Sequence, residues 1–263
     1  MIIDSHVHIF PDKIADKAVA SVRDFYDLAM SYDGRLETIL TEGAKAGVDK
    51  FLILSVATAA DQVTGINNFL AKCVHEHSDK LIGFCAMHPD FEDPETEIKR
   101  AEELGLKGIK LHPDFQRFEI DSEKAMRISK AAAGKMPILF HTGDFRTEWS
   151  SPSRMAKIAE MFPDLDVIAS HFGGWSEWDE AARVYKTKNV YVDSSSSLYS
   201  MSPEEARIMI DVFGADHVFF GTDFPMWDIP TELERFSKLP LTDEEREMIF
   251  HKNIENLLAK YEK

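Results

Sequence analysis

The sequence lacks several features that are typical of secreted, disulfide-rich or membrane-spanning proteins. It contains two cysteines, Cys73 and Cys85, which form neither a disulfide framework nor a CxxC pair. It contains no run of about 18 apolar residues, so we expect no transmembrane helix. The first ten residues, MIIDSHVHIF, lack the basic segment and long apolar run of a secretory signal. These absences favour a cytoplasmic protein.

Positive charge is also scarce. Lys and Arg number 30 against 46 Asp and Glu, which gives a formal net charge of −16. Such a balance repels phosphate backbones and anionic membranes over most of the surface. We therefore expect a small-molecule substrate, rather than nucleic acid or a membrane, as the partner. Linkers, low-complexity stretches and charged tails are absent as well, so we expect one domain over 1–263.

Eight short apolar runs predict β-strands. Most are nearly continuous apolar stretches, which is typical of strands that are buried on both faces of a parallel sheet. The predicted strands are 2–8, 50–56, 81–87, 108–112, 138–141, 167–171, 190–193 and 218–222.

Segments with helical spacing separate these runs and predict a repeated β/α unit. The predicted helices are 60–77, 94–104, 122–133, 152–161, 175–185, 203–213 and a last helix from Thr242 to Leu258. Eight such units favour a single, distorted (β/α)8 TIM-type barrel over a doubly wound open sheet, which usually has fewer strands. The first strand-to-strand interval is the longest, so an additional helix or an active-site flap is expected within 11–34.

Ionisable residues gather at the ends of the predicted strands. In a (β/α)8 barrel the C-terminal ends of all strands open onto one face, where active sites lie. The sequence therefore brings distant residues to one mouth. The residues concerned are His6, His8, Lys110, His112, His141, His171, Asp193 and Asp223.

The first and fourth strands each carry a pair of these residues. Residues two apart in a strand point to the same side, so His6 and His8 are expected to converge. Neutral imidazoles are common zinc ligands, although two histidines on a strand are also often solvated or hydrogen-bonded. By the same rule Lys110 and His112 share a face. A lysine there would bind a substrate anion or, as a carbamate, bridge two metals, and both interpretations stay open.

Three more strand ends carry one candidate each. His141 would cap its strand by a hydrogen bond or act as a third metal ligand. His171 would do the same or serve as a general acid or base, because histidine titrates near neutral pH. Asp223 would satisfy backbone N–H groups in a turn, or contact a metal and take a proton from its water.

These strand ends resemble a known family when they are taken in order. The motifs are DSHVH at 4–8, GIKLHP at 108–113, PILFHTG at 137–143, HFGG at 171–174 and GTDFP at 221–225. They resemble the amidohydrolase superfamily, and within it the amidohydrolase-2 branch of aminocarboxymuconate-semialdehyde decarboxylase-like enzymes. The resemblance implies one divalent metal, usually zinc, with manganese and iron as alternatives. It also implies that His6, His8, His141 and Asp223 bind the metal and that His171 is an acid/base.

The expected activity is a metal-dependent hydrolysis of a small amide, ester or lactone, with His171 and Asp223 as the catalytic residues. The alternative is a non-oxidative decarboxylation of a small unsaturated or aromatic acid, because the branch contains both activities. We expect Lys110, His112, Arg146 and Trp175 to bind the substrate.

Two other classes are disfavoured. A catalytically idle binding barrel would keep buried polar residues at a cost. A deoxyribonuclease would carry a further bridging Glu at a strand end. Barrels of this kind often form homodimers, so a homodimer stays open.

Overall fold

The computed structural model describes residues 1–262, in which eight parallel strands alternate with helices. The strand order follows the sequence, so each strand pairs with the next one along the chain. The strands are β1 (Ile3–His8), β2 (Lys50–Leu54), β3 (Leu81–Ala86), β4 (Gly108–Leu111), β5 (Ile138–Phe140), β6 (Val167–Ala169), β7 (Val190–Asp193) and β8 (Val218–Phe219).

The chain after β8 closes the sheet against β1. Val7 and Phe224 form a parallel bridge, and the Asp223 amide donates to the His6 carbonyl at 2.9 Å. The sheet is therefore a nearly closed (β/α)8 barrel, which confirms the predicted fold.

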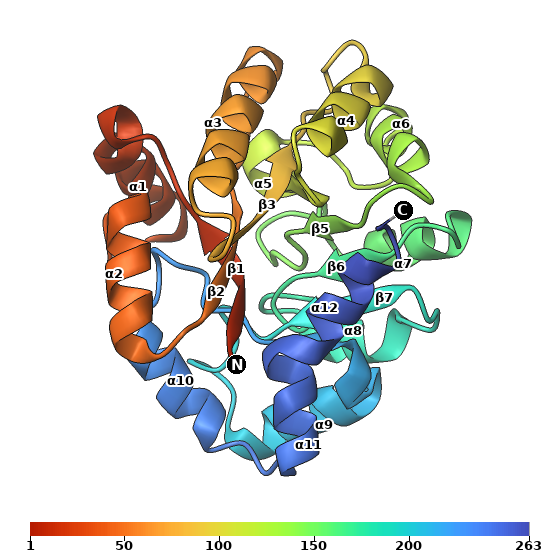
Figure 1. Ribbon diagram of the computed structural model, residues 1–263. Helices are drawn as coiled ribbons and strands as arrows, with labels where there is room; N and C mark the ends of the chain where they lie inside the picture. The colour runs from red at the N-terminus through yellow and green to blue at the C-terminus, as the bar shows by residue number, and fades with distance from the viewer. Residues whose placement is uncertain (263) are drawn as a thin grey trace.

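Helices surround the strands, as Figure 1 shows. The helices are α1 (Asp12–Tyr26), α2 (Leu36–Ala46), α3 (Val63–Glu76), α4 (Pro94–Glu103), α5 (Pro113–Gln116), α6 (Glu123–Ala132), α7 (Pro152–Met161), α8 (Trp178–Val184), α9 (Pro203–Phe213), α10 (Ile229–Ser237), α11 (Asp243–Glu247) and α12 (Asn253–Ala259). Short turns of other helix types lie at η1 (Ala60–Gln62), η2 (Ala215–His217) and η3 (Met248–Lys252). None of the helices described over 1–262 is long and apolar enough to cross a membrane.

Two apolar layers hold the barrel together. A larger cluster lies between the strands and the surrounding helices, because alternate strand residues such as Phe51, Ile53 and Phe140 point outward. A smaller cluster joins inward-pointing strand residues to Ile254 and Leu257 of α12. In Figure 1, α12 lies across the end of the barrel at which the strands begin. The opposite end, where the strands finish, is therefore left to carry the functional residues.

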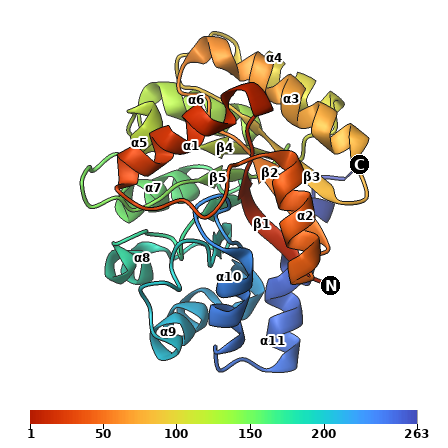
Figure 2. The ribbon, with the colours of Figure 1, turned by 90° about the vertical axis from the view of Figure 1, so that its left-hand side faces the viewer.

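The additional helix expected within 11–34 is α1. It precedes α2, which is the regular helix between β1 and β2. The end of α1 contacts α5, since the Phe25 and Phe115 rings stack with their centroids 4.2 Å apart. Figure 2 shows α1 lying beside α5.

Several predicted boundaries were wrong by a few residues. The strands predicted at 138–141, 167–171 and 218–222 end at Phe140, Ala169 and Phe219. His171 and Asp223 have φ angles of 62° and 61°, which a continuing strand does not allow. The polar residues therefore lie in the turns just beyond the strands.

The helix boundaries were partly right. Ser202 and Thr242 form the capping boxes of α9 and α11, each with a Glu three residues on. Ser151 precedes α7 but makes no side-chain capping bond. The single last helix was wrong, because the π-helical turn η3 interrupts it. The helix predicted from Trp175 begins only at Trp178.

Glu232 of α10 gives the stability of this fold a pH dependence. Its side chain is buried beside Arg235, and burial raises the pKa of its carboxyl to about 7. Because the pKa of Glu232 is higher in the folded state than in the unfolded state, its contribution to the free energy of unfolding is fully present below pH 4.5. This contribution is lost as the pH rises through about 7. We expect Glu232→Gln to stabilise the protein by about 1–3 kcal/mol at pH 8.5, with little effect at pH 5. Urea unfolding at both pH values checks this.

The exposed Glu234, on the same helix, provides the control substitution, Glu234→Gln. Its effect on the free energy of unfolding is expected to be small at both pH values. Equal effects of Glu232→Gln at pH 5 and pH 8.5 would contradict the prediction.

Candidate active site

The two histidines of β1 converge, as the period-two rule predicts. Their Nε2 atoms lie 3.2 Å apart, and the Lys110 Nζ lies 3.2 Å from the Nε2 of His6. Two ligands of one tetrahedral ion at 2.0–2.1 Å would lie about 3.3 Å apart. His6 and His8 therefore have the spacing that a shared metal ion requires.

Asp193 fixes the ring of His6. Its Oδ2 lies 3.0 Å from the His6 Nδ1, and both side chains are buried. A carboxylate on one ring nitrogen holds the proton there and leaves the other nitrogen free to bind a metal. The Nε2 of His6 is thus the atom presented to the site.

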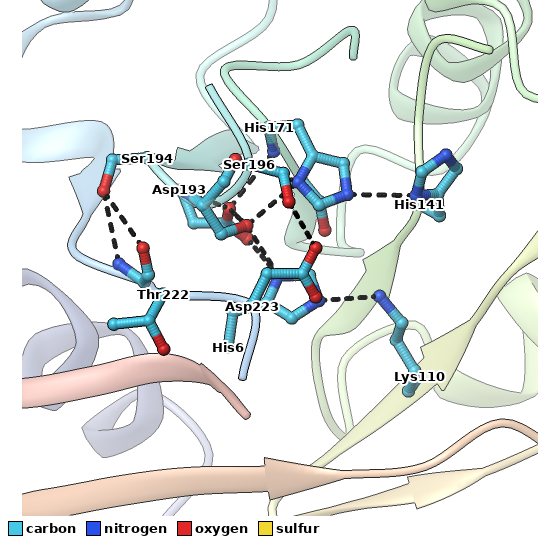
Figure 3. A network of polar contacts seen from close by, with 12 residues as sticks. His6, Lys110, His141, His171, Asp193, Ser194, Ser196, Thr222 and Asp223 are labelled. Carbon is cyan, nitrogen blue, oxygen red and sulfur yellow. Dashed lines mark hydrogen bonds and ion pairs between the residues drawn. The ribbon is translucent and has the colours of Figure 1, made fainter. Parts of the chain in front are cut away.

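Asp223 completes this group from the turn after β8. Its Oδ1 lies 3.6 Å from the Nε2 atoms of both His6 and His8. Its Oδ2 accepts a hydrogen bond of 2.5 Å from the Ser196 hydroxyl, which in turn accepts one of 2.8 Å from the Trp227 indole. The hydroxyl therefore holds the carboxylate with one oxygen turned toward the histidines, as Figure 3 shows.

His141 and His171 approach the site from the next side of the barrel. The His141 Nδ1 and the His171 Nε2 lie 3.0 Å apart. The His171 Nδ1 lies 3.0 Å from the Ser195 carbonyl, which can only accept a hydrogen bond. The proton of a neutral His171 ring is therefore on Nδ1, and its Nε2 carries a lone pair.

Burial keeps these imidazoles neutral. Desolvation lowers the pKa of His171 to about 4, and it lowers the pKa values of His6, His8 and His141 well below the usual 6.5. Metal ions bind the neutral imidazole. The protonation states of the site thus match those of a metal-binding centre.

The described residues contain three groups whose donor atoms lie close enough to hold a metal ion. His6, His8 and Asp223 form one group, with all donor atoms within 4.8 Å of one another. His6 and Asp193 also group with His171. The third group joins His112 and His141 to Asp114, but the two rings stack at 4.0 Å and 7°, so their in-plane lone pairs do not converge. The first group fits an ion best.

His141 also fits a ligand role. Its Nε2 and the Asp114 Oδ2 face each other at 3.8 Å, and both are buried without a hydrogen-bond partner. A metal-binding histidine commonly donates its second ring nitrogen to a carboxylate. This arrangement leaves the Nδ1 of His141 for the site.

A small cavity lies against these side chains. The residues that line it come from the four loops after β5, β6, β7 and β8 and from the end of α1. They are Tyr26, His141, His171, Trp175, Ser196, Asp223 and Met226.

The four predicted substrate-binding residues occupy different places. Lys110 is buried in the site, and burial lowers its pKa to about 8. His112 stacks on His141, and Trp175 lines the cavity. Arg146 pairs with Asp144, to which its guanidinium donates two hydrogen bonds, at 2.8 and 2.6 Å. Substrate binding by these four residues stays a prediction.

Sequence reasoning missed several residues of the site. Asp193 was noted at a strand end, but without a role. The buried run Ser194–Ser197 directly after β7 was a signal for Ser195 and Ser196, because four buried hydroxyls need partners. Tyr26 had no comparable signal, since it lies on a helix far from any strand end.

Ser196→Ala should show how much the orientation of Asp223 matters. The substitution removes the hydrogen bond to Oδ2 and frees the carboxylate to rotate. We expect metal affinity to fall about 10-fold, because outer-shell partners commonly contribute 10- to 100-fold. Competition with a chelating dye measures this affinity. The exposed Ser200→Ala is the control, and an unchanged affinity in Ser196→Ala would contradict the prediction.

The sequence profile of the Amidohydrolase family matches residues 3–260. The chain belongs to this family. A search of curated protein sequences finds no match. The resemblance seen in the strand-end motifs is thus confirmed, and the chain has the fold and family of an enzyme.

Solved structures share the fold of this amidohydrolase. An uncharacterized TIM-barrel protein from Bordetella bronchiseptica has a TM-score of 0.77, 20% identity and 99% of each chain covered. A dihydroxybenzoic acid decarboxylase from Polaromonas sp. JS666, with bound manganese and the inhibitor 2-nitroresorcinol, has a TM-score of 0.75 and 16% identity, covering 100% of this chain and 98% of that one.

A third structure represents a hydrolase. It is a probable 2-pyrone-4,6-dicarboxylic acid hydrolase from Acinetobacter baumannii with citric acid bound. Its TM-score is 0.72 and its identity 14%, with 98% of this chain and 99% of that one covered. The fold of this amidohydrolase therefore occurs with more than one chemistry.

Proposed function

We propose that this amidohydrolase is a metal-dependent hydrolase of a small amide, ester or lactone. The observation that carries the proposal is the group formed by His6, His8 and Asp223, whose donor atoms lie within 4.8 Å of one another. His171 lines the cavity beside this group, and its Nε2 carries a lone pair. Metal-assisted hydrolysis uses metal ligands next to a proton acceptor in this way.

One divalent ion would be held by the Nε2 atoms of His6 and His8, the Nδ1 of His141 and an oxygen of Asp223. Zinc is our first choice, with manganese or iron as alternatives, because all three accept nitrogen and carboxylate ligands. When bound, such an ion polarises a substrate carbonyl and makes a water molecule more acidic.

The chain's own residues supply proton transfer and positioning. Asp223 and the Nε2 of His171 can each accept a proton from the attacking water. His171 can then return that proton to the leaving group, while Ser195 keeps its ring oriented. Lys110 is the buried cation of the site and would hold a negatively charged part of the substrate.

Decarboxylation of a small aromatic or unsaturated acid is the second candidate. The aromatic side chains at the mouth favour it, because Tyr26 and Trp175 both line the cavity and their rings lie 5.3 Å apart. The manganese-containing decarboxylase with the same fold also binds an aromatic inhibitor. In this reaction a protonated His171 would donate to the substrate carbon that loses carbon dioxide.

The test begins with the metal content of untagged protein, measured by inductively coupled plasma mass spectrometry. About one equivalent per chain is expected, and none after metal is added back would overturn the proposal. Lactones, amides and hydroxybenzoic acids are then assayed in H₂¹⁸O. One ¹⁸O atom in the product shows hydrolysis, whereas carbon dioxide release without it shows decarboxylation and overturns the first candidate.

His171→Gln separates the acid/base role from metal binding. We expect a large loss of turnover while the metal content stays at about one equivalent. Full turnover in this variant would exclude His171 as the acid/base.

A further inference from the structure

The end of α1 places a phenol over the candidate site. Tyr26 is the last residue of this helix, and its ring lines the cavity together with His171 and Asp223. Its hydroxyl oxygen lies 2.8 Å from the Nε2 of His112. The phenol is thus the one group that α1, the additional helix, contributes to the cavity lining.

The direction of this hydrogen bond follows from the other side of the His112 ring. The Phe115 amide donates to the His112 Nδ1 at 3.3 Å, where His112 caps the short helix α5. A nitrogen that accepts a hydrogen bond carries no proton, so the proton of the neutral ring lies on Nε2. His112 therefore donates to the Tyr26 oxygen, and the phenol proton remains available for another acceptor.

The phenol keeps that proton at neutral pH. Burial raises the pKa of Tyr26 well above 10, and the nearby carboxylates of Asp223 and Asp114 raise it further. The group thus acts as a hydrogen-bond donor rather than as an anion.

Arg146 holds the helix end in place. One guanidinium nitrogen donates to the Phe25 carbonyl at 2.7 Å, and the group lies 4.6 and 5.1 Å from the ring centroids of Phe25 and Tyr26. Asp144 takes up two other nitrogens of the same guanidinium. Arg146 is therefore engaged on several sides, by a carboxylate, a helix end and two aromatic faces.

We propose that the Tyr26 hydroxyl donates a hydrogen bond to a negatively charged oxygen of the substrate, and that Arg146 is a positioning residue that fixes Tyr26 over the site. The proposal rests on the proposed function, because it assumes that the cavity takes the substrate. It applies to a carboxylate and to the oxyanion that forms in hydrolysis. It also gives Arg146 a different role from the substrate-binding role that the sequence suggests.

The first test measures binding to metal-loaded protein. The probes are 2-nitroresorcinol, followed by its visible absorbance, and citrate, followed by calorimetry. Tyr26→Phe removes only the hydroxyl and is expected to raise the Kd of each probe about 10-fold. The control is Tyr32→Phe, which removes a phenol that bonds to Asp228 instead. Unchanged Kd values in Tyr26→Phe overturn the proposal.

Arg146→Met tests the positioning role. It should weaken binding of the same probes. In the Tyr26→Phe background it should weaken binding little further, because both substitutions remove the same hydrogen bond to the probe. Fully additive effects overturn this role.

The second test uses metal-free protein with ¹⁵N-labelled histidine. Long-range proton–nitrogen correlation spectra report which ring nitrogen of His112 carries the proton, with Nε2 expected. A proton on Nδ1 would mean that the phenol donates to His112, which overturns the proposal. A protein that binds no metal would overturn the proposed function, while this spectrum would still decide the direction of the Tyr26 bond.

Discussion

Asp223→Asn is expected to lower turnover by about 10³-fold and to weaken metal binding at least 10-fold. The amide has the shape of the carboxylate but no charge, so it neutralises a dication less well and accepts a proton poorly. The Oδ1 of Asp223 lies 3.6 Å from the Nε2 atoms of both His6 and His8, where no other described carboxylate completes the group. No second carboxylate among the described residues can therefore replace Asp223 as the ligand beside His6 and His8.

The measurement combines metal content at equilibrium with turnover on whichever substrate class proves active. Asp216→Asn, in the exposed turn before β8, is the matched control and should change neither. Circular dichroism confirms that both variants fold. If Asp223→Asn kept its metal affinity and its turnover, the carboxylate would have neither proposed role.

The positions of the candidate site residues could be predicted because the barrel imposes a simple rule. Strand ends in a parallel barrel meet at one face, so a polar residue after each apolar run lies at the mouth. His6, His8, His141, His171 and Asp223 all follow this rule. The rule depends on strand order alone, and strand order is visible in the apolar runs.

Residues whose placement depends on tertiary contacts could not be predicted. Tyr26 reaches the cavity because α1 folds back over α5, and no local pattern specifies that packing. Arg146 bonds to Asp144 and to the Phe25 carbonyl, and the second of these contacts joins residues 121 positions apart, which no local pattern specifies. Ser196 holds Asp223 only because two loops 27 residues apart meet.

Boundary errors at the strand ends have a local physical cause. The strand predicted from the apolar run continues through Ser170 to His171, whereas the backbone leaves the strand at Ala169. At His171 and Phe172 the φ angles are 62° and 49°, a left-handed conformation that costs a non-glycine residue energy. Tertiary contacts hold it, including the bond from the His171 amide to Asp193 at 3.1 Å. Such strain at a candidate catalytic histidine is not encoded in apolar periodicity.

Gly143→Ala is expected to destabilise the protein by about 3–5 kcal/mol, the largest stability effect that we predict. Gly143 follows His141 by two residues and has a φ of +77°, which favours glycine. A Cβ there would lie 2.4 Å from the Cα and C atoms of Gly174 and 2.7 Å from the Trp175 nitrogen. Backbone atoms cannot rotate away as a side chain can, so the loops after β5 and β6 would have to separate.

Gly134→Ala separates the two causes of this loss. Gly134 has a similar φ of +69°, but a Cβ there would meet no atom within 4 Å. It should therefore cost only about 1 kcal/mol, from backbone strain alone. Urea unfolding of both variants measures the difference, and equal losses would show that the close approach at Gly174 is unimportant. Because the same two loops carry His141 and His171, whose nitrogens lie 3.0 Å apart, the folded fraction of Gly143→Ala should also bind metal more weakly than that of Gly134→Ala.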